Sequence, residues 1–288
     1  SLINSSETII PKINKIIELE NKNKQGKLFF RKGDLRNKQF LESVFKEFKE
    51  KRLKISSVIH CAGLKSVGES VSNPLLYWDC NLNSTLSLLG VMDKYDCRNI
   101  VFSSSATVYG LSDNDKLTED SRIEPINPYG STKYTIENLL RDCYESQNNK
   151  WKIINLRYFN PIGAHPSGMI GENPKGIPNN IFPLINKVAL CQISHLNVFG
   201  NDWDTLDGTG VRDYIHVMDL AEGHVKALEY LFENNSINMN LNLGTGKGTS
   251  VLELINIFKR VNNVNVPTIF TNRRKGDFGS VIADNTKA

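Results

Sequence analysis

A tyrosine and a lysine one helical turn apart carry the clearest chemical signal in this 288-residue sequence. Tyr129 and Lys133 stand at positions i and i+4 of a helical pattern that starts at Pro128, so both side chains project from one face. A free tyrosine, with a pKa of about 10, is a poor base at neutral pH, but a cation about 4 Å away favours its ionised form. Taken alone, the pair is also compatible with the first turn of an amphipathic helix. Ser105, at the end of a strand-like run upstream, favours the interpretation of Tyr129 as a base.

These residues lie on short β-branched runs that alternate with helical patterns, which is typical of βαβ units and a parallel sheet. Strands are expected at residues 27–30, 57–61, 99–103 and 152–156, and helices at 39–52, 74–95 and 128–147. Prolines and glycines crowd the segment from Pro161 to Pro178, which predicts a long functional loop. Beyond it we expect a helix at 179–191, a strand at 196–199, a strand and helix within 214–232, a strand at 239–243 and a helix from Ser250.

Composition narrows the class of protein. Hydrophobic residues make up 40% and charged residues 23%, as in ordinary folded domains, and no apolar run reaches the roughly 18 residues of a membrane span. The net charge of +4 comes from scattered basic residues, which argues against a nucleic-acid surface. The five cysteines never adopt CxxC spacing, so neither a disulfide framework nor a metal site is expected. With no leader-like start, the sequence predicts a cytoplasmic protein.

No GxGxxG motif occurs, and the nearest glycine-rich segment runs from Gly244 to Ser250. It matches neither that motif nor a Walker loop, so it is interpreted as an ordinary turn, with a phosphate cradle as the weaker alternative. His60 and His216 are expected to be structural, whereas His165 is left open as a residue that could face a substrate. Asp207 and Asp213 are expected to cap loops.

Several long segments closely resemble the UDP-glucose 4-epimerases of the extended short-chain dehydrogenase/reductase family. They are residues 57–70, 102–110, 128–133, 157–168, 176–180 and 207–217. The resemblance implies a Rossmann-like doubly wound parallel sheet with a smaller C-terminal α/β domain that binds the substrate. It also implies a tightly held NAD that takes hydride from C4 of a UDP-hexose, a 4-keto sugar that turns over in the site, and return of the hydride to the other face.

The same resemblance implies residue roles. Tyr129 would be the catalytic base, Lys133 would lower its pKa and hold the nicotinamide ribose, and Ser105 would bind the sugar oxygen and relay the proton. Cofactor contacts are implied for Asn4, Ser5, Asp34, Leu35, Cys61, Ala62, Gly63, Leu64, Lys65, Ser103, Tyr129, Lys133, Tyr158 and Phe159. Substrate contacts are implied for Lys65, Ser105, Tyr129, Asn160, Asn180, Ile181, Asn197, Phe199, Arg212, Arg274, Asp277 and Val281. Cys80 stands where the family often has Asn, so one cofactor contact is expected to be missing.

Further expectations follow from the family. Residues 1–160 would form the NAD-binding domain, and residues 161–288 mainly the UDP-sugar-binding domain, with some segments returning to the sheet. Relative to the family the sequence lacks the opening βα unit and the C-terminal end, so we expect a portion of a longer enzyme that is weakly active or inactive by itself. A homodimer is expected through the helices at 74–95 and 128–147. Val281, a small residue at a position beside the sugar 2-substituent, predicts that N-acetylated UDP-sugars are also accepted.

Two other functions share some of these sequence features. A nucleotide-sugar dehydratase would need a carboxylate beside Ser105, but Ala106 and Thr107 follow, so that reaction is disfavoured. A non-catalytic sugar-nucleotide-binding protein would explain the missing glycine-rich loop, but not the presence of all three of Ser105, Tyr129 and Lys133.

Overall fold

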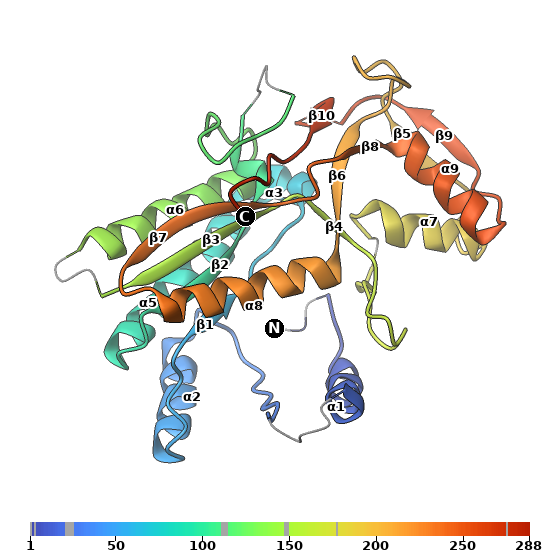
Figure 1. The fold of residues 1–288 in the computed structure, drawn as a ribbon. Helices are drawn as coiled ribbons and strands as arrows, with labels where there is room; N and C mark the ends of the chain where they lie inside the picture. The colour runs from blue at the N-terminus through green and yellow to red at the C-terminus, as the bar shows by residue number, and fades with distance from the viewer. Residues whose placement is uncertain are drawn as a thin grey trace.

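A four-stranded parallel sheet forms the centre of the computed structural model, which describes residues 2, 4–20, 26–110, 115–146, 150–176, 178–274 and 276–288 (Figure 1). The strands lie in the order β1 (Val58–His60), β2 (Asn99–Ser105), β3 (Lys152–Tyr158) and β7 (Ile237–Leu243). Each neighbouring pair is parallel. The predicted α/β fold with a parallel sheet is therefore confirmed, and β7 shows that the chain returns to this sheet after residue 161.

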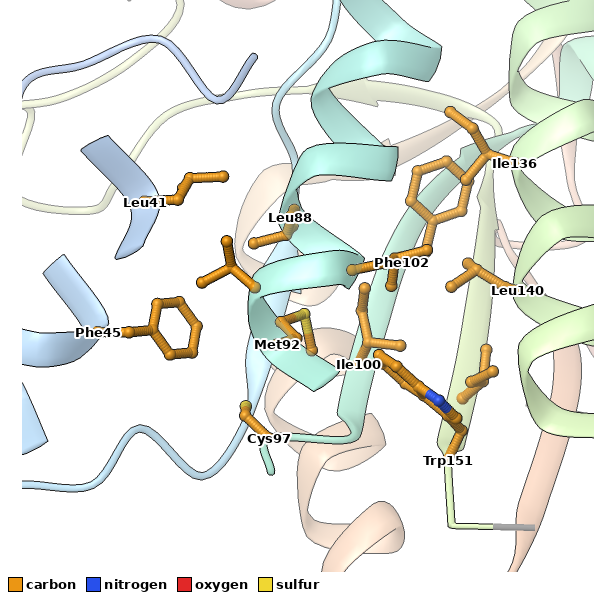
Figure 2. Packing of buried hydrophobic residues seen from close by; sticks show 13 residues of the cluster. Leu41, Phe45, Leu88, Met92, Cys97, Ile100, Phe102, Ile136, Leu140 and Trp151 are labelled. Carbon is orange, nitrogen blue, oxygen red and sulfur yellow. The ribbon is translucent and has the colours of Figure 1, made fainter. Parts of the chain in front are cut away.

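Helices cover both faces of the sheet. Ile100 and Phe102 of β2 pack with α5 (Ser84–Lys94) and α6 (Pro128–Glu145), and α2 (Lys38–Glu50) lies against α5 (Figure 2). Val101 points the other way, because successive strand side chains alternate between faces, and packs in a cluster with Leu231 of α8 (Val217–Glu233). This two-sided burial holds the carboxyl end of β2 in a fixed position.

Local signals explain where the helices begin. Asn127 caps α6 by accepting a hydrogen bond from the backbone N–H of Gly130, and Pro128 occupies the first turn. The helix expected at 74–95 is divided into α4 (Pro74–Tyr77), a π-helix η1 (Trp78–Asn83) and α5. Such π segments often mark functional sites. Two further short elements contact α6: α3 (Val67–Ser72) and the 3₁₀ turn η2 (Ala106–Val108).

The C-terminal part contributes two small sheets. One contains β4 (Asn160–Ile162), β6 (Val211–His216), β8 (Gly248–Ser250) and β10 (Ser280–Val281), and the other pairs β5 (Leu196–Phe199) with β9 (Thr268–Thr271). Two helices, α7 (Ile181–Ala189) and α9 (Val251–Asn262), pack on β5 through a separate apolar cluster. Helix α1 (Ile9–Glu20) precedes all of these elements.

One predicted strand is wrong. Among the described residues no strand forms at 27–30, because a strand requires a hydrogen-bonded neighbour and this segment belongs to no ladder in that part of the chain. Phe29 instead packs edge-on against Phe48 of α2, with 5.3 Å between the ring centroids.

Candidate active site

Ser105, Tyr129 and Lys133 meet at the carboxyl edge of the parallel sheet. The end of β2 positions Ser105, and the first turn of α6 positions the other two residues. All three are buried. Ser105 lies within reach of the Tyr129 hydroxyl, and its Oγ accepts from the backbone N–H and the hydroxyl of Thr107, at 3.2 and 2.9 Å. The structure thus brings together the three residues that the sequence predicted to act together.

A close backbone approach fixes this arrangement. Gly130 follows Tyr129, and a Cβ placed on it would lie 2.3 Å from the carbonyl oxygen of Thr107. Only glycine therefore allows the first turn of α6 to press against η2. This contact sets Tyr129 beside Ser105.

The electrostatics differ from the sequence-based expectation. Burial raises the pKa of the Tyr129 hydroxyl, and the hydrogen bond with Ser105 opposes that effect. Lys133 was expected to lower this pKa, but its Nζ donates to the carbonyl of Ser103 at 2.6 Å and lies 5.9 Å from the centroid of the Tyr129 ring. Burial also lowers the pKa of Lys133 to about 8. In this arrangement burial sets the direction, so the pKa of Tyr129 is raised and not lowered as expected.

Asn81 of η1 is a site residue that the sequence analysis missed. Its Oδ1 accepts from the backbone N–H of Leu64 at 2.7 Å, and its Nδ2 donates to the carbonyl of Leu64 and to Thr132 Oγ1. The side chain thereby holds the turn that follows β1. A Cβ on Gly63 would lie 3.8 Å from Lys133 Nζ, so this turn reaches the catalytic lysine. Asn81 supplies a buried amide next to Cys80, where one was expected to be missing.

A second polar network lies behind the site. Ser103 is hydrogen-bonded with Cys61 at 3.1 Å and also with the hydroxyl of Tyr158. The Tyr158 hydroxyl in turn contacts the ring of His224, which the sequence did not single out. Burial raises the pKa of Tyr158, so this phenol is held neutral. The network brings three of the predicted cofactor residues together.

Two cavities share a wall beside these residues. One, of about 790 Å³, is lined by predicted residues from both halves of the chain: Lys65, Ser105, Tyr129, Tyr158, Phe159, Asn160, Asn180, Arg212, Asp277 and Val281. The other, of about 200 Å³, is lined by Asn160, Asn180, Ile181, Asn197, Phe199, Arg212, Arg274 and Asp277. Asn160, Asn180, Arg212 and Asp277 line both.

The smaller cavity carries two guanidinium groups. Arg212 lies 3.5 Å from the carboxylate of Asp277, and Arg274 stacks over the ring of Phe199 at 3.7 Å. Burial lowers the pKa of Arg274, with Arg212 acting in the same direction and Asp277 opposing it. Two guanidiniums this close together favour a ligand with more than one negative charge.

Ten of the predicted cofactor residues lie outside the linings of these cavities, and four of them, Asn4, Ser5, Asp34 and Leu35, come from the first part of the chain. Asn4 and Ser5 are exposed, and Leu35 packs at the edge of the main apolar cluster. Asp34 binds Arg36 at 2.6 Å, which lowers the pKa of its carboxyl to about 2, and Arg36 also binds Asp79 of η1. Through Arg36, the structure thus links Asp34 to the π-helix.

The first part of the glycine-rich segment, residues 244–247, is an ordinary turn, and Gly248–Ser250 continue as strand β8. The backbone N–H groups of Thr245 and Gly246 donate to the carboxylate of Asp213, at 2.7 and 2.9 Å. The Asp213 carboxylate therefore already occupies the backbone N–H groups of this turn. This observation argues against the alternative that the turn binds a phosphate. Asp207 accepts from Thr209 in the same capping manner, as expected.

The histidines follow the predictions in part. His60 is buried and bonded to Thr85 at 2.9 Å, and His216 caps α8 by accepting from the backbone N–H of Met218. His165 lines a third cavity, with its ring 3.4 Å from Glu20.

No group of three potential metal ligands occurs in the part of the chain that the structure describes. No described helix is long and apolar enough to span a membrane.

Comparison with known families decides the assignment. Residues 7–244 match the model of the NAD dependent epimerase/dehydratase family. The chain belongs to this family. A UDP-glucose 4-epimerase of Cyamopsis tetragonoloba is 51% identical over all of this chain and 79% of that relative, and one of Bacillus subtilis is 48% identical over all of this chain and 81% of that relative. The crystal structure of the UDP-glucose 4-epimerase of Bifidobacterium longum, in complex with NAD+ and UDP, superposes with a TM-score of 0.91 at 43% identity, covering 99% of this chain and 81% of that one.

The site fits the dinucleotide that the family uses. Lys133 is a buried ammonium with three N–H donors, and Ser103 takes one of them. Gly63 leaves bare backbone beside that ammonium. The donors that remain on Lys133 suit the vicinal hydroxyls of a ribose. The turn of residues 61–65, together with Tyr129 and Lys133, would hold the cofactor.

Proposed function

We infer that this protein is a UDP-glucose 4-epimerase, an NAD-dependent isomerase that inverts C4 of a UDP-hexose through a 4-keto intermediate. The observation that carries this conclusion is the shared wall of the two cavities. Asn160, Asn180 and Arg212 face both the Ser105–Tyr129 pair and the two-arginine cavity. One ligand can therefore present a diphosphate to the arginines and a sugar to the tyrosine.

The residues divide the reaction between them. Arg212 and Arg274 bind the diphosphate oxygens and hold the sugar end in the larger cavity. Ser105 binds the sugar 4-oxygen, and Tyr129 takes the 4-hydroxyl proton and returns it after the sugar has turned over. Bound NAD supplies the reversible hydride acceptor. Lys133 orients the cofactor through its remaining N–H donors.

Proton NMR of UDP-galactose incubated with the purified protein in D₂O tests this function. We expect UDP-glucose to accumulate with its C4 hydrogen retained, because the hydride leaves and returns without exchange with solvent. Bound NAD should be found in the same preparation by mass spectrometry. Deuterium at C4, or NAD-loaded protein that leaves UDP-galactose unchanged, would refute the assignment.

We also propose that Val281 admits N-acetylated UDP-sugars. Val281 lies on β10, pairs in register with Arg212 and lines the larger cavity. An acetamido group adds three heavy atoms at C2, and valine lacks most of the volume of an aromatic ring, so both hexose classes would fit.

Replacement of Val281 by tyrosine tests that size gate. The variant should lose UDP-GlcNAc turnover and largely keep UDP-glucose turnover, since a ring excludes only the larger substrate. The matched control is Val281→Thr, which is similar in volume and should keep both activities. A parent enzyme without measurable N-acetyl turnover would defeat the gate hypothesis.

Finally, we propose a homodimer in which α4–η1–α5 and α6 pair with the same helices of a second copy. Leu75 is 82% exposed, and Leu76 and Leu86 on the same helical segment are 43% and 46% exposed. Apolar side chains on a helix pair of this kind support a helical interface. Sedimentation at micromolar concentration should give a dimer, and Leu75→Asp should dissociate it; a monomeric parent protein would refute the proposal.

A further inference from the structure

The loop between β4 and α7 contacts two distant parts of the molecule and is closed by a bridge within itself. Gly163, with φ +92°, begins it, and a Cβ there would lie 2.5 Å from the ring of His216. Ala164 pairs with Gly171 in an isolated antiparallel bridge. The backbone N–H of Lys175 donates to the carbonyl of Asn4 at 2.9 Å. These contacts hold Glu172, the residue after Gly171, at a defined position beside the cavities.

One carboxylate oxygen of Glu172 contacts two predicted ligand-binding residues. Its Oε1 accepts from Asn180 Nδ2 at 2.6 Å and lies 3.3 Å from Lys65 Nζ. Lys65 follows the turn after β1, whereas Asn180 caps α7, and both line the larger cavity. Asn180 also lines the smaller, two-arginine cavity. Glu172 thus links the cofactor side of the cleft to the nucleotide side.

The chemistry of a carboxylate fixes the orientation of the Asn180 amide. An ionised carboxylate only accepts hydrogen bonds, so Asn180 must turn its NH₂ group towards Glu172. That NH₂ group keeps a second N–H, and a diphosphate, which also only accepts, needs such donors. If the Asn180 amide were flipped, its oxygen would face the Glu172 carboxylate and the diphosphate, which are both hydrogen-bond acceptors. Lys65 meanwhile offsets the negative charge that Glu172 would otherwise place near an anionic ligand.

We propose that Glu172 is a positioning residue for substrate binding: it orients the Asn180 amide, and pairs with Lys65, so that both donate towards the diphosphate of the UDP-hexose. This inference rests on the proposed function, because it presumes a UDP-linked ligand in the cleft. It concerns binding of the nucleotide and leaves proton transfer at Tyr129 unaffected.

The substitution Glu172→Gln tests the proposal because it keeps the shape of the side chain and removes the charge. The glutamine amide can pair with the Asn180 amide in either orientation, because it both donates and accepts hydrogen bonds. The NH₂ group of Asn180 is then no longer fixed towards the diphosphate. We expect the dissociation constant for UDP, measured by calorimetry on the holoenzyme, and the KM for UDP-galactose to rise about 10-fold. The turnover number kcat should stay close to that of the parent enzyme.

Glu20→Gln is the matched control. Glu20 is also a carboxylate that contacts this loop, through His165 at 3.4 Å, but no contact with Asn180 or Lys65 is seen in the described residues. The control variant should bind UDP like the parent protein. A weakening equal to that of Glu172→Gln would show a general charge effect and overturn the proposal.

A double-mutant cycle with Asn180→Ala completes the test. If Glu172 acts chiefly through Asn180, then Glu172→Gln should add little further loss of UDP affinity in the Asn180→Ala background. An unchanged UDP affinity in the single variant, or a full additional loss in the double variant, would overturn the inference. Failure of the proposed function would look different: the parent holoenzyme itself would leave UDP-galactose unconverted.

Discussion

The catalytic side chains and the nucleotide-side arginines are held in opposite ways. Tyr129 and Lys133 are buried on one turn of α6, and Lys133 is bonded to the backbone of β2. Arg212 and Arg274 come from separate strands and loops and are held by an ion pair and by stacking on an aromatic ring. Proton transfer here therefore depends on a rigid arrangement fixed by packing, whereas nucleotide binding depends on charges that tertiary contacts bring together.

Loss of the Tyr129 hydroxyl should have the largest effect. Tyr129→Phe keeps the ring in its buried place and removes the group that exchanges the proton with the sugar. We expect turnover of UDP-galactose to fall by about 10²–10⁴-fold, which is the usual contribution of a positioned acid or base. Coupled measurement of kcat at saturating substrate checks this, and near-parental turnover would remove Tyr129 from the mechanism.

Loss of a nucleotide-side guanidinium should act on affinity instead. Arg274→Ala should raise the KM for UDP-galactose roughly 10- to 100-fold, because charge-assisted contacts to the diphosphate disappear. The neighbouring Arg273 provides the control, since it binds Asp202 at 2.7 Å and stacks on Trp203. Arg273→Ala should leave KM nearly unchanged. A fall in kcat with constant KM for Arg274→Ala would contradict the division into two regions.

A third effect concerns stability in acid and is separate from activity. Burial lowers the pKa of His60 in β1 to about 3, with the charge of Lys133 acting in the same direction. Between pH 6.5 and 3 the unfolded chain binds a proton that the folded chain does not, so stability falls as pH falls through this window, by at most about 1.4 kcal/mol per pH unit. His60→Asn should make the pH dependence of the urea midpoint shallower there.

His195→Asn serves as the comparison for that measurement, because His195 lies near the surface beside Ser194. It should leave the slope of the urea midpoint against pH unchanged. If both variants gave the parental slope, protonation of the buried sheet region would not limit stability in acid.

The two regions also differ in how far the sequence predicts them. Tyr129 and Lys133 lie on one helical turn, so periodicity alone places them near each other. Ser105 was expected beside them because it ends a strand at the carboxyl edge of the sheet and because of the family resemblance. The parallel sheet follows equally well from its β-branched runs. Residues 27–30 form a short apolar run without β-branched residues and have no neighbouring strand in the described chain, which the local sequence does not reveal.

Residues that act through tertiary contacts could not be predicted in this way. Asn81 supports the turn at Leu64 from 17 residues away, and Glu172 meets Lys65 across 107 residues. Neither contact can be predicted from the local sequence. Once the backbone is known, the π-helix η1 indicates that Asn81 is a candidate functional residue. The pKa of Tyr129 was predicted with the wrong direction for a related reason, since burial is a property of the whole fold.

The most direct test of the division between rigid catalysis and charge-based binding is the dissociation constant of Tyr129→Phe for UDP, measured by calorimetry beside the parent holoenzyme. Tyr129 lines only the larger of the two cavities, whereas both arginines line the smaller one. The variant should therefore bind UDP as tightly as the parent protein while its turnover collapses. A loss of UDP affinity that matches the loss of turnover would contradict the account, because the two regions would then act as one.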